Sequence, residues 1–292
     1  MSASPRPSVR QRRLAAELRR LREERQLTGD DVAAELSWST AKVSRIENAR
    51  TGARISDVRR LLRLYEVNGP HHDELIALAE DAAEKGWWEA FPSIGPEYAQ
   101  LIALEADARK ALCWENLVVP GLLQTESYAR EVISGWQIVD TLTPQEIQRR
   151  IEVRMRRQQV VERQPRPLEL QVVLDEAVLR RRIGDAAVMI EQVSHLLRMS
   201  TLPHVEILVL PLDAQQRILG GSFTLLEFPP LYDAPFPDTV HTESLTLHYL
   251  EDERETNMYR LAHHHMRQTA LPPEESRLLL DQTRDWWTKP RE

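Results

Sequence analysis

The sequence predicts a multidomain, mainly α-helical chain, in which an N-terminal bundle of five helices precedes an α+β domain with a mainly antiparallel sheet. Three observations carry this expectation. Apolar residues recur at helical spacing up to residue 84, an aromatic stretch with Gly and Pro follows, and four short β-rich segments lie between residues 205 and 251. We therefore expect domains over 1–85 and 97–292, with 86–96 as a packed connection.

Composition describes a globular protein. The 292 residues are 42% hydrophobic and 28% charged. No apolar run approaches the roughly 18 residues of a membrane span, and the Arg-rich start lacks the apolar segment of a secretory signal. Cys113 is the single cysteine, so no internal disulfide can form. A cytoplasmic protein without membrane partners is expected.

Charge is unevenly distributed along the chain. The net charge is −7, yet residues 1–68 hold 15 Lys and Arg against 9 Asp and Glu, a balance of +6. The remaining residues hold 23 against 36, a balance of −13. A basic head on an acidic body favours a polyanion-binding module joined to a domain with another task, although ordinary surface variation would give the same numbers.

Helical patterns fill the first 85 residues. The first helix carries leucines at spacings of four and three, with arginines between them. Residues that favour the N-cap precede the next three helices, and a fifth helix is expected over 71–84. These caps are Thr28, Ser39 and Ser56.

The stretch "LSWSTAKVSRIENAR" (36–50) has the pattern of a tight turn followed by a short helix. Such a turn needs a left-handed residue, and another often follows the second helix; Gly is the usual choice at both places. Here the candidates are Ser37 and Ala49. Either both accept left-handed strain, or Asn48, which tolerates that region better, ends the helix one residue early.

The same stretch predicts a helix that reads DNA. Val43 and Ile46 face a core, and the opposite side is polar and basic, as required of a helix in the major groove. Arg45 can bind guanine with two hydrogen bonds, and Ala41 can touch a thymine methyl. The expected base-reading residues are Thr40, Ala41, Lys42, Ser44 and Arg45. Those expected at the phosphate backbone are Thr28, Ser39, Asn48, Arg50 and Arg54. The alternative is a small helical bundle with a solvated basic face.

Residues 10–67 resemble the XRE (Cro/C1-type) helix-turn-helix family, through "VAAEL", the short turn and "STAKVSRIE". Further segments, including "LVVPGLLQTESYAR", "GGSFTLLEFP" and "LPPEESRLLL", are similar to a large actinobacterial group of regulators. In that group an XRE head precedes a C-terminal domain of uncharacterised function, and a small partner protein is often encoded nearby. The resemblance implies base contacts from Ser39 to Arg45 and phosphate contacts at Thr28 and Asn48.

The rest of the chain alternates helices and strands. Strong caps, such as Thr143 with Glu146, mark several helix starts. Helices are expected at 96–110, 125–134, 143–162, 186–199, 252–269 and 273–287. Strands are expected at 168–175, 205–211, 222–229, 238–244 and 245–251.

No group of residues in the second domain predicts catalysis, a cofactor or a metal. His263, His264 and His265 are consecutive on a helix and point about 100° apart, so they cannot converge on one ion, and we expect them in solvent. His241 is expected in solvent too. Cys113 is followed by Trp114 in an apolar stretch and is expected as a buried thiol. "LGGSF" (219–223) precedes a strand and is expected as a turn or bulge.

These observations predict a sequence-specific regulator of transcription that binds double-stranded DNA as a homodimer, in the cytoplasm and on the nucleoid when bound. The second domain is expected to bind a small-molecule effector or a small partner protein and to mediate dimerisation. The alternative is an adaptor or antitoxin-like protein whose main task is to hold a partner polypeptide. An enzyme has little support, and no cofactor is expected.

Overall fold

A computed structural model describes residues 7–91, 94–138, 141–215, 220–230, 236–243 and 246–289. The chain forms two compact units, and the first passage from one to the other lies between Ala90 and Phe91. Residues 92–93 of the predicted connection, residue 219 of the predicted turn, and residues 244 and 245, which end and begin the last two predicted strands, lie outside the described part. No helix in that part is long and apolar enough to cross a membrane.

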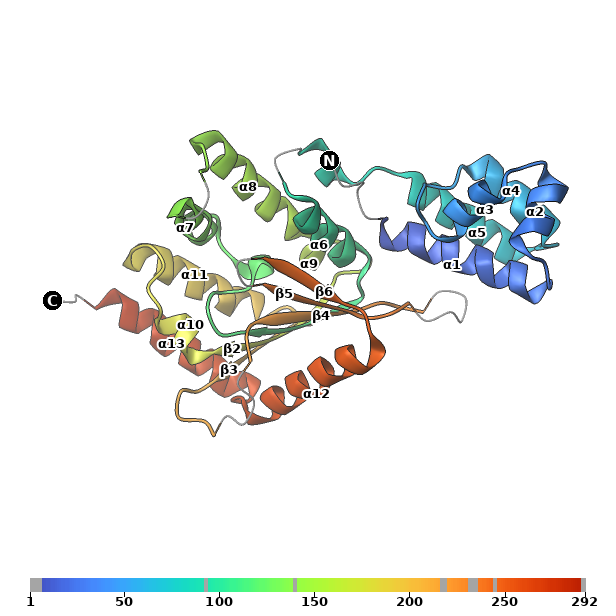
Figure 1. Cartoon of the computed structure of the whole chain (residues 1–292). Coiled ribbons are helices and arrows are strands. Elements are labelled where there is room, and N and C mark those ends of the chain that lie inside the picture. The colour runs from blue at the N-terminus through green and yellow to red at the C-terminus, as the bar shows by residue number, and fades with distance from the viewer. Residues whose placement is uncertain are drawn as a thin grey trace. The chain divides into compact units, whose positions relative to one another are not determined.

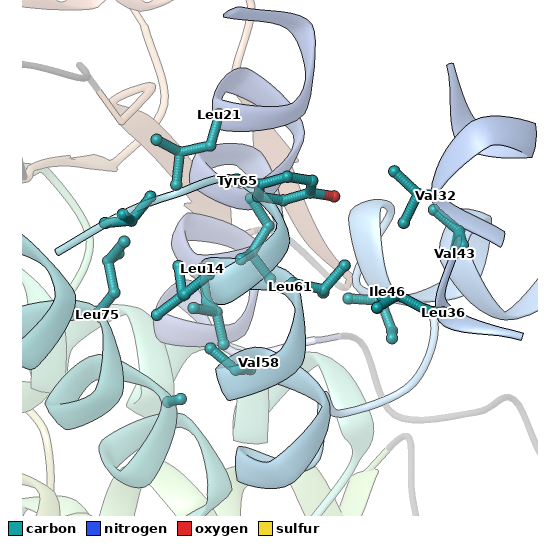
Figure 2. Close-up of a cluster of buried hydrophobic side chains, with 14 of the residues drawn as sticks. Leu14, Leu21, Val32, Leu36, Val43, Ile46, Val58, Leu61, Tyr65 and Leu75 are labelled. Atoms are coloured by element: carbon teal, nitrogen blue, oxygen red, sulfur yellow. The ribbon is translucent and has the colours of Figure 1, made fainter. Parts of the chain in front are cut away.

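The described part of the N-terminal unit contains five α-helices, as the periodicity predicts, followed by the 3₁₀ helix Trp87–Ala90. The α-helices are α1 (Val9–Glu24), α2 (Gly29–Leu36), α3 (Thr40–Glu47), α4 (Ile55–Leu64) and α5 (Pro70–Ala83). Their apolar faces share one core, which Figure 2 shows with Leu14, Val43 and Leu61 pointing inward. Thr28 and Ser39 cap α2 and α3 as predicted. The predicted cap Ser56 is wrong, because α4 starts earlier and Arg54 occupies the N-cap without a side-chain hydrogen bond.

Helices α1 to α4 end in the same backbone motif. In each, a left-handed residue donates its N–H three residues back, and the next residue donates its N–H five residues back, which is the Schellman motif. None of the four left-handed residues is glycine: they are Gln26 (φ 58°), Ser37 (φ 53°), Ala49 (φ 51°) and Glu66 (φ 55°). The predicted strain at Ser37 and Ala49 is therefore present. The alternative of an early end at Asn48 is wrong, since its φ is −107°.

The second unit is built on a six-stranded sheet with the order β3-β2-β1-β4-β5-β6. The strands are β1 (Lys110–Glu115), β2 (Glu169–Asp175), β3 (Val205–Leu210), β4 (Phe223–Glu227), β5 (Thr239–Glu243) and β6 (Leu247–Leu250). Three of the five pairings described are antiparallel, and β1–β2 and β2–β3 are parallel. The predicted mainly antiparallel sheet is thus a mixed one, with its parallel half on the β3 side.

The central strand β1 is absent from the predicted elements. The expected helix 96–110 ends at Asp107 as α6 (Pro96–Asp107), and the chain becomes a strand from Lys110. β1 pairs with β2 on one side and β4 on the other. It is buried on both faces, so "KALCWE" shows no alternation, and its short apolar run does not distinguish a strand from a helix.

Helices cover both faces of the sheet. Figure 1 shows α12 (Glu253–Thr269) on one side, and α6, α7 (Glu126–Gly135) and α8 (Pro144–Arg157) on the other. The predicted helix 143–162 begins with the expected capping box but divides into α8 and a short α9. The described part of the unit is completed by α9 (Gln159–Glu162), α10 (Glu176–Arg180), α11 (Ala186–Met199), α13 (Pro273–Thr288) and the 3₁₀ turns Gly121–Leu123 and Trp136–Ile138.

Candidate nucleic-acid interface

The turn between α2 and α3 is fixed from both sides. Ser37 is left-handed, and the N–H of Trp38 donates to Ala33 O at 2.8 Å to close the end of α2. Two residues later, Ser39 Oγ accepts from the Lys42 N–H at 3.3 Å and starts α3. Trp38 packs against the core of the unit. This pair of short helices with a three-residue turn is a helix-turn-helix.

One side of α3 belongs to the core and the other is open. Val43 and Ile46 are 2% and 4% exposed, and both lie among the core residues drawn in Figure 2. The predicted base-reading side chains on the opposite side are exposed, with one exception described next. They are Thr40, Ala41, Ser44 and Arg45.

Lys42 differs from the rest of this predicted row. Its Nζ lies 2.8 Å from Asp57 Oδ1 and 3.7 Å from the centre of the Trp38 ring, and its side chain is one-third exposed. The pair ties the start of α3 to α4. Lys42 is therefore occupied inside the unit, and contact with DNA would require it to leave both partners.

The exposed residues of α3 also have partners. Thr40 Oγ1 donates to Asp30 Oδ1 at 2.7 Å, and Arg45 Nε donates to Ala41 O at 3.1 Å. Asn48, predicted at a phosphate, donates from Nδ2 to Ser44 O at 2.7 Å. These contacts lie at the surface, where water already competes for them, so they can be exchanged for contacts with a ligand at small net cost.

The N-terminus of α2, with the predicted phosphate contact Thr28, holds a carboxylate of its own. Asp31 accepts from the Thr28 N–H at 2.8 Å and from its hydroxyl at 2.6 Å, and Thr28 Oγ1 accepts from the Asp31 N–H. The Thr28 hydroxyl and N–H hold the pKa of Asp31 below its ordinary value. With Asp30 beside it, this end of α2 carries two acids, which oppose a phosphate there.

The remaining predicted phosphate contacts are exposed. Arg50 follows α3 as the last residue of its Schellman motif, and Arg54 stands before α4. Both cations thus lie at the ends of the loop that leaves the candidate recognition helix.

Glu47 at the end of α3 has a structural role that the sequence interpretation did not assign. Arg22 of α1 binds it through two hydrogen bonds, of 2.7 and 3.0 Å, and these side chains are 13% and 8% exposed. Arg22 also donates to Leu27 O at 2.7 Å. Hydrogen bonding to Glu47 raises the pKa of Arg22. The pair fixes the orientation of α3 on the unit, and an acid one residue after Ile46 in an otherwise basic helix is the signal for it.

In the second unit, polar groups collect on the sheet face away from α12. Successive strand partners place Cys113, Thr224, His241 and Tyr249 in one row across β1, β4, β5 and β6. Cys113 is buried as predicted, and burial raises its pKa to about 12, which makes it inert. His241 is 6% exposed, so the predicted solvated position is wrong; burial and, secondarily, Arg157 lower its pKa to about 3.

Above this row lies a buried ion pair. Arg157 of α8 donates to both carboxylate oxygens of Glu105 in α6, at 2.5 and 2.6 Å, and to Tyr98 Oη at 3.1 Å. At the end of β1, burial raises the pKa of Glu115 to about 8, so this carboxyl is mostly protonated at neutral pH. None of these groups was singled out from the sequence, because they come together from α6, α8 and β1 only in the folded unit.

The histidine run on α12 does not converge. His263 is 2% exposed and its neighbours His264 and His265 point elsewhere, so the predicted solvated position is wrong for His263 and correct for the exposed His264. Burial lowers the pKa of His263 to about 4. Within the described residues, no three His, Cys, Asp or Glu side chains are placed to hold a metal ion.

Comparisons with known proteins agree with the two units. Residues 13–75 match a family described as "Helix-turn-helix domain". Residues 98–282 match the family described as "Domain of unknown function (DUF5753)". No curated protein and no solved structure matches the chain. Because the second match spans more than half of the sequence, the chain belongs to the DUF5753 family, and its N-terminal helix-turn-helix domain indicates a DNA-binding protein.

Proposed function

We propose that the protein is a sequence-specific regulator of transcription, of the XRE type found in an actinobacterial group, that reads double-stranded DNA as a homodimer. One observation supports it most directly. The core-facing side of α3 is completely buried, while Thr40, Ala41, Ser44 and Arg45 project from the side that a major groove would receive.

In the proposed complex Arg45 reads a guanine. Its guanidinium leaves Ala41 O, which is an exposed contact, and gives two hydrogen bonds to the base. Ala41 then faces a thymine methyl, and Thr40 and Ser44 bond to bases or to phosphate. Lys42 contributes after exchange of its partner Asp57.

The backbone contacts of the proposed complex surround α3. Ser39 lies at its start and Asn48 at its end, while Arg50 and Arg54 follow in the next loop. Such contacts set register and orientation without reading sequence. Thr28 is the weakest member of this set, because Asp31 already occupies its hydroxyl and N–H.

Two helix-turn-helix units are needed for specific recognition of a DNA site, because one short helix contacts few base pairs. A dimer would read an inverted repeat whose half-sites lie about 34–36 Å apart, one turn of the duplex. We assign dimerisation and the binding of an effector or small partner protein to the DUF5753 unit, whose ligand would change the affinity for DNA through the spacing of the heads. The protein would act in the cytoplasm, on the nucleoid.

Selection of binding sites from random DNA by the full-length protein tests this function. We expect enrichment of an inverted repeat with half-sites one turn apart. A matched selection with Arg45→Ala should lose preference at one position of each half-site. Failure of the wild-type protein to enrich any sequence, combined with stable capture of a small protein from its host, would favour the adaptor instead.

A further inference from the structure

The second unit contains a cavity of about 510 Å³ that the helix-turn-helix does not share. Its walls come from four segments that are distant in the sequence: the start of α6, the end of α7 with the turn after it, one side of α8, and the end of β5 with the start of β6. Residues that matter here are Tyr98, Ile133, Trp136, Arg150, Arg154 and Glu243. A volume of several hundred Å³ is typical of a small-molecule site, and the lining combines apolar side chains with polar and charged ones.

Two arginines on α8 line the cavity, and one of them, Arg154, forms no ion pair with a described residue. Arg154 Nη1 donates to the neutral Gln124 Oε1 at 2.8 Å, and its buried Nε has no hydrogen-bond partner among the described residues. One turn earlier, Arg150 lines the same cavity. By contrast Arg157, one turn later, is matched by both oxygens of Glu105. Arg157 is thus neutralised beneath the cavity, whereas Arg154 at its wall forms no ion pair with a described residue.

The pKa of the Tyr98 hydroxyl shows the effect of the positive charges of α8. Burial acts to raise its pKa, yet the charges of Arg157 and Arg154 outweigh burial, so the pKa lies below its ordinary value. A buried donor without a partner, such as Arg154 Nε, destabilises the free protein by its lost hydration. A ligand oxygen that accepts from it removes this penalty, and a charged oxygen does so most strongly.

The other residues that line the cavity restrict the kind of ligand that can bring such an oxygen to Arg154. Ile133 and Trp136 offer an aliphatic and an aromatic surface, which suit an apolar body. Glu243 and Glu97, both exposed, add negative charge at the same cavity and oppose a polyanion such as a nucleoside triphosphate.

We propose that this cavity binds a small organic monoanion with an aromatic or apolar body, whose charged group is held by Arg154. The inference names the ligand class and the site for the effector role assigned above to the DUF5753 unit, and in that sense it rests on the proposed function. Binding itself requires neither DNA nor a dimer.

Fluorescence titration of the full-length protein, without DNA, tests the site. The probes are anilinonaphthalene sulfonate, an aromatic monoanion, and anilinonaphthalene, which has the same rings without the charge. We expect one bound sulfonate per chain and at least ~10-fold weaker binding of the neutral probe, as the loss of a charge-assisted contact implies.

Arg154→Gln should abolish this preference for the anion, and Arg154→Lys, which keeps the charge, should retain part of it. Arg149→Gln is the matched control, since Arg149 is exposed on the same helix and does not line the cavity; it should bind as the wild type does. Each variant is first compared with the wild type by its melting temperature. If Arg154→Gln does not fold, the two probes on the wild type and on Arg154→Lys still decide.

Equal binding of the two probes by the wild type would overturn the proposal, as would undiminished sulfonate binding by a folded Arg154→Gln. Gel shifts on the same preparations separate this result from the proposed function. A chain that binds DNA without preferring the anion refutes only the cavity, whereas the reverse result refutes only the DNA-binding role.

Discussion

The two units each bury one Arg–Glu pair, but they use it differently. In the head, Arg22–Glu47 joins α1 to α3, and the candidate functional side chains of α3 project outward from that fixed helix. In the DUF5753 unit, Arg157–Glu105 lies beneath a cavity that is lined by Arg154. The comparison shows that a buried Arg–Glu pair can support either an exposed surface or a cavity. Measurements of DNA binding and of stability on variants of both pairs distinguish the two cases.

The largest effects should come from breaking the two pairs. Glu47→Ala and Glu105→Ala each leave a buried guanidinium unpaired, which costs roughly 3–5 kcal/mol of unfolding free energy. Urea denaturation measures the loss. Glu126→Ala, at the exposed pair with Arg130, is the control and should change little. At a temperature at which both variants are folded, Glu47→Ala should weaken DNA binding and Glu105→Ala should leave it unchanged. An equal loss of DNA affinity in both variants would contradict the different roles given to the two pairs.

Acid should destabilise the DUF5753 unit through its buried imidazoles. Their folded pKa values, about 4 for His263 and about 3 for His241, lie below the 6.5 of an unfolded chain. Above pH 6.5 both states are neutral and nothing is lost. As the pH falls from 6.5 to 4, the unfolded chain takes up a proton that His263 does not, so stability drops by about 3 kcal/mol for this residue.

Urea denaturation as a function of pH checks this loss. His263→Gln should reduce the slope between pH 6.5 and 4 and leave the part that His241 contributes, whereas His264→Gln, at the exposed neighbour, should leave the slope unchanged. If the unfolding free energy of both variants depends on pH with the same slope, the acid sensitivity comes from residues other than His263.

Substitution of two arginines of the helix-turn-helix unit should affect DNA binding in different ways. Arg45→Ala should cost roughly 1–3 kcal/mol on the selected site and relax one base position. Arg54→Ala should weaken binding to every sequence and reduce the salt dependence by about one unit. Gel shifts on specific and random DNA at several salt concentrations measure both. An equal loss on the two DNAs for Arg45→Ala would remove its reading role.

The smallest effect is a gain. Ala49→Gly should stabilise the head by roughly 1 kcal/mol, because a left-handed backbone strains alanine but not glycine. Thermal unfolding measures it. Ala34→Gly, at an exposed site inside α2, is the control and should destabilise by a similar amount. Loss of stability in Ala49→Gly would show that the buried methyl group outweighs the strain.

How much the sequence could predict differs between the units. The outward row of α3 follows from a 3.6-residue period over one short helix, so Thr40, Ala41, Ser44 and Arg45 were predicted on the exposed side without tertiary information. The partner of Lys42 was not, because Asp57 is fifteen residues away and meets it only after α4 packs. Whether these side chains touch bases stays a prediction.

In the second unit most of the chemistry depends on long-range pairing. β1 was missed, and with it the parallel half of the sheet and the row through Cys113 and His241. His263 had a local signal, since it lies three residues before the buried Met266 on the same helix. No local sequence signal predicts the cavity, because the residues that line it come together only when four separate segments fold.

Asp30 has a consequence for how such a protein would search a chromosome. Its carboxylate receives the Thr40 hydroxyl at the edge of the reading surface, and Asp31 stands beside it. Negative charge there weakens attraction to any duplex alike, since nonspecific affinity comes from phosphates. A correct site can compensate through base contacts, whereas a wrong one cannot. In a sequence-specific DNA-binding protein of the kind proposed, the acids would therefore shorten the time spent on every site, and only base contacts would lengthen it.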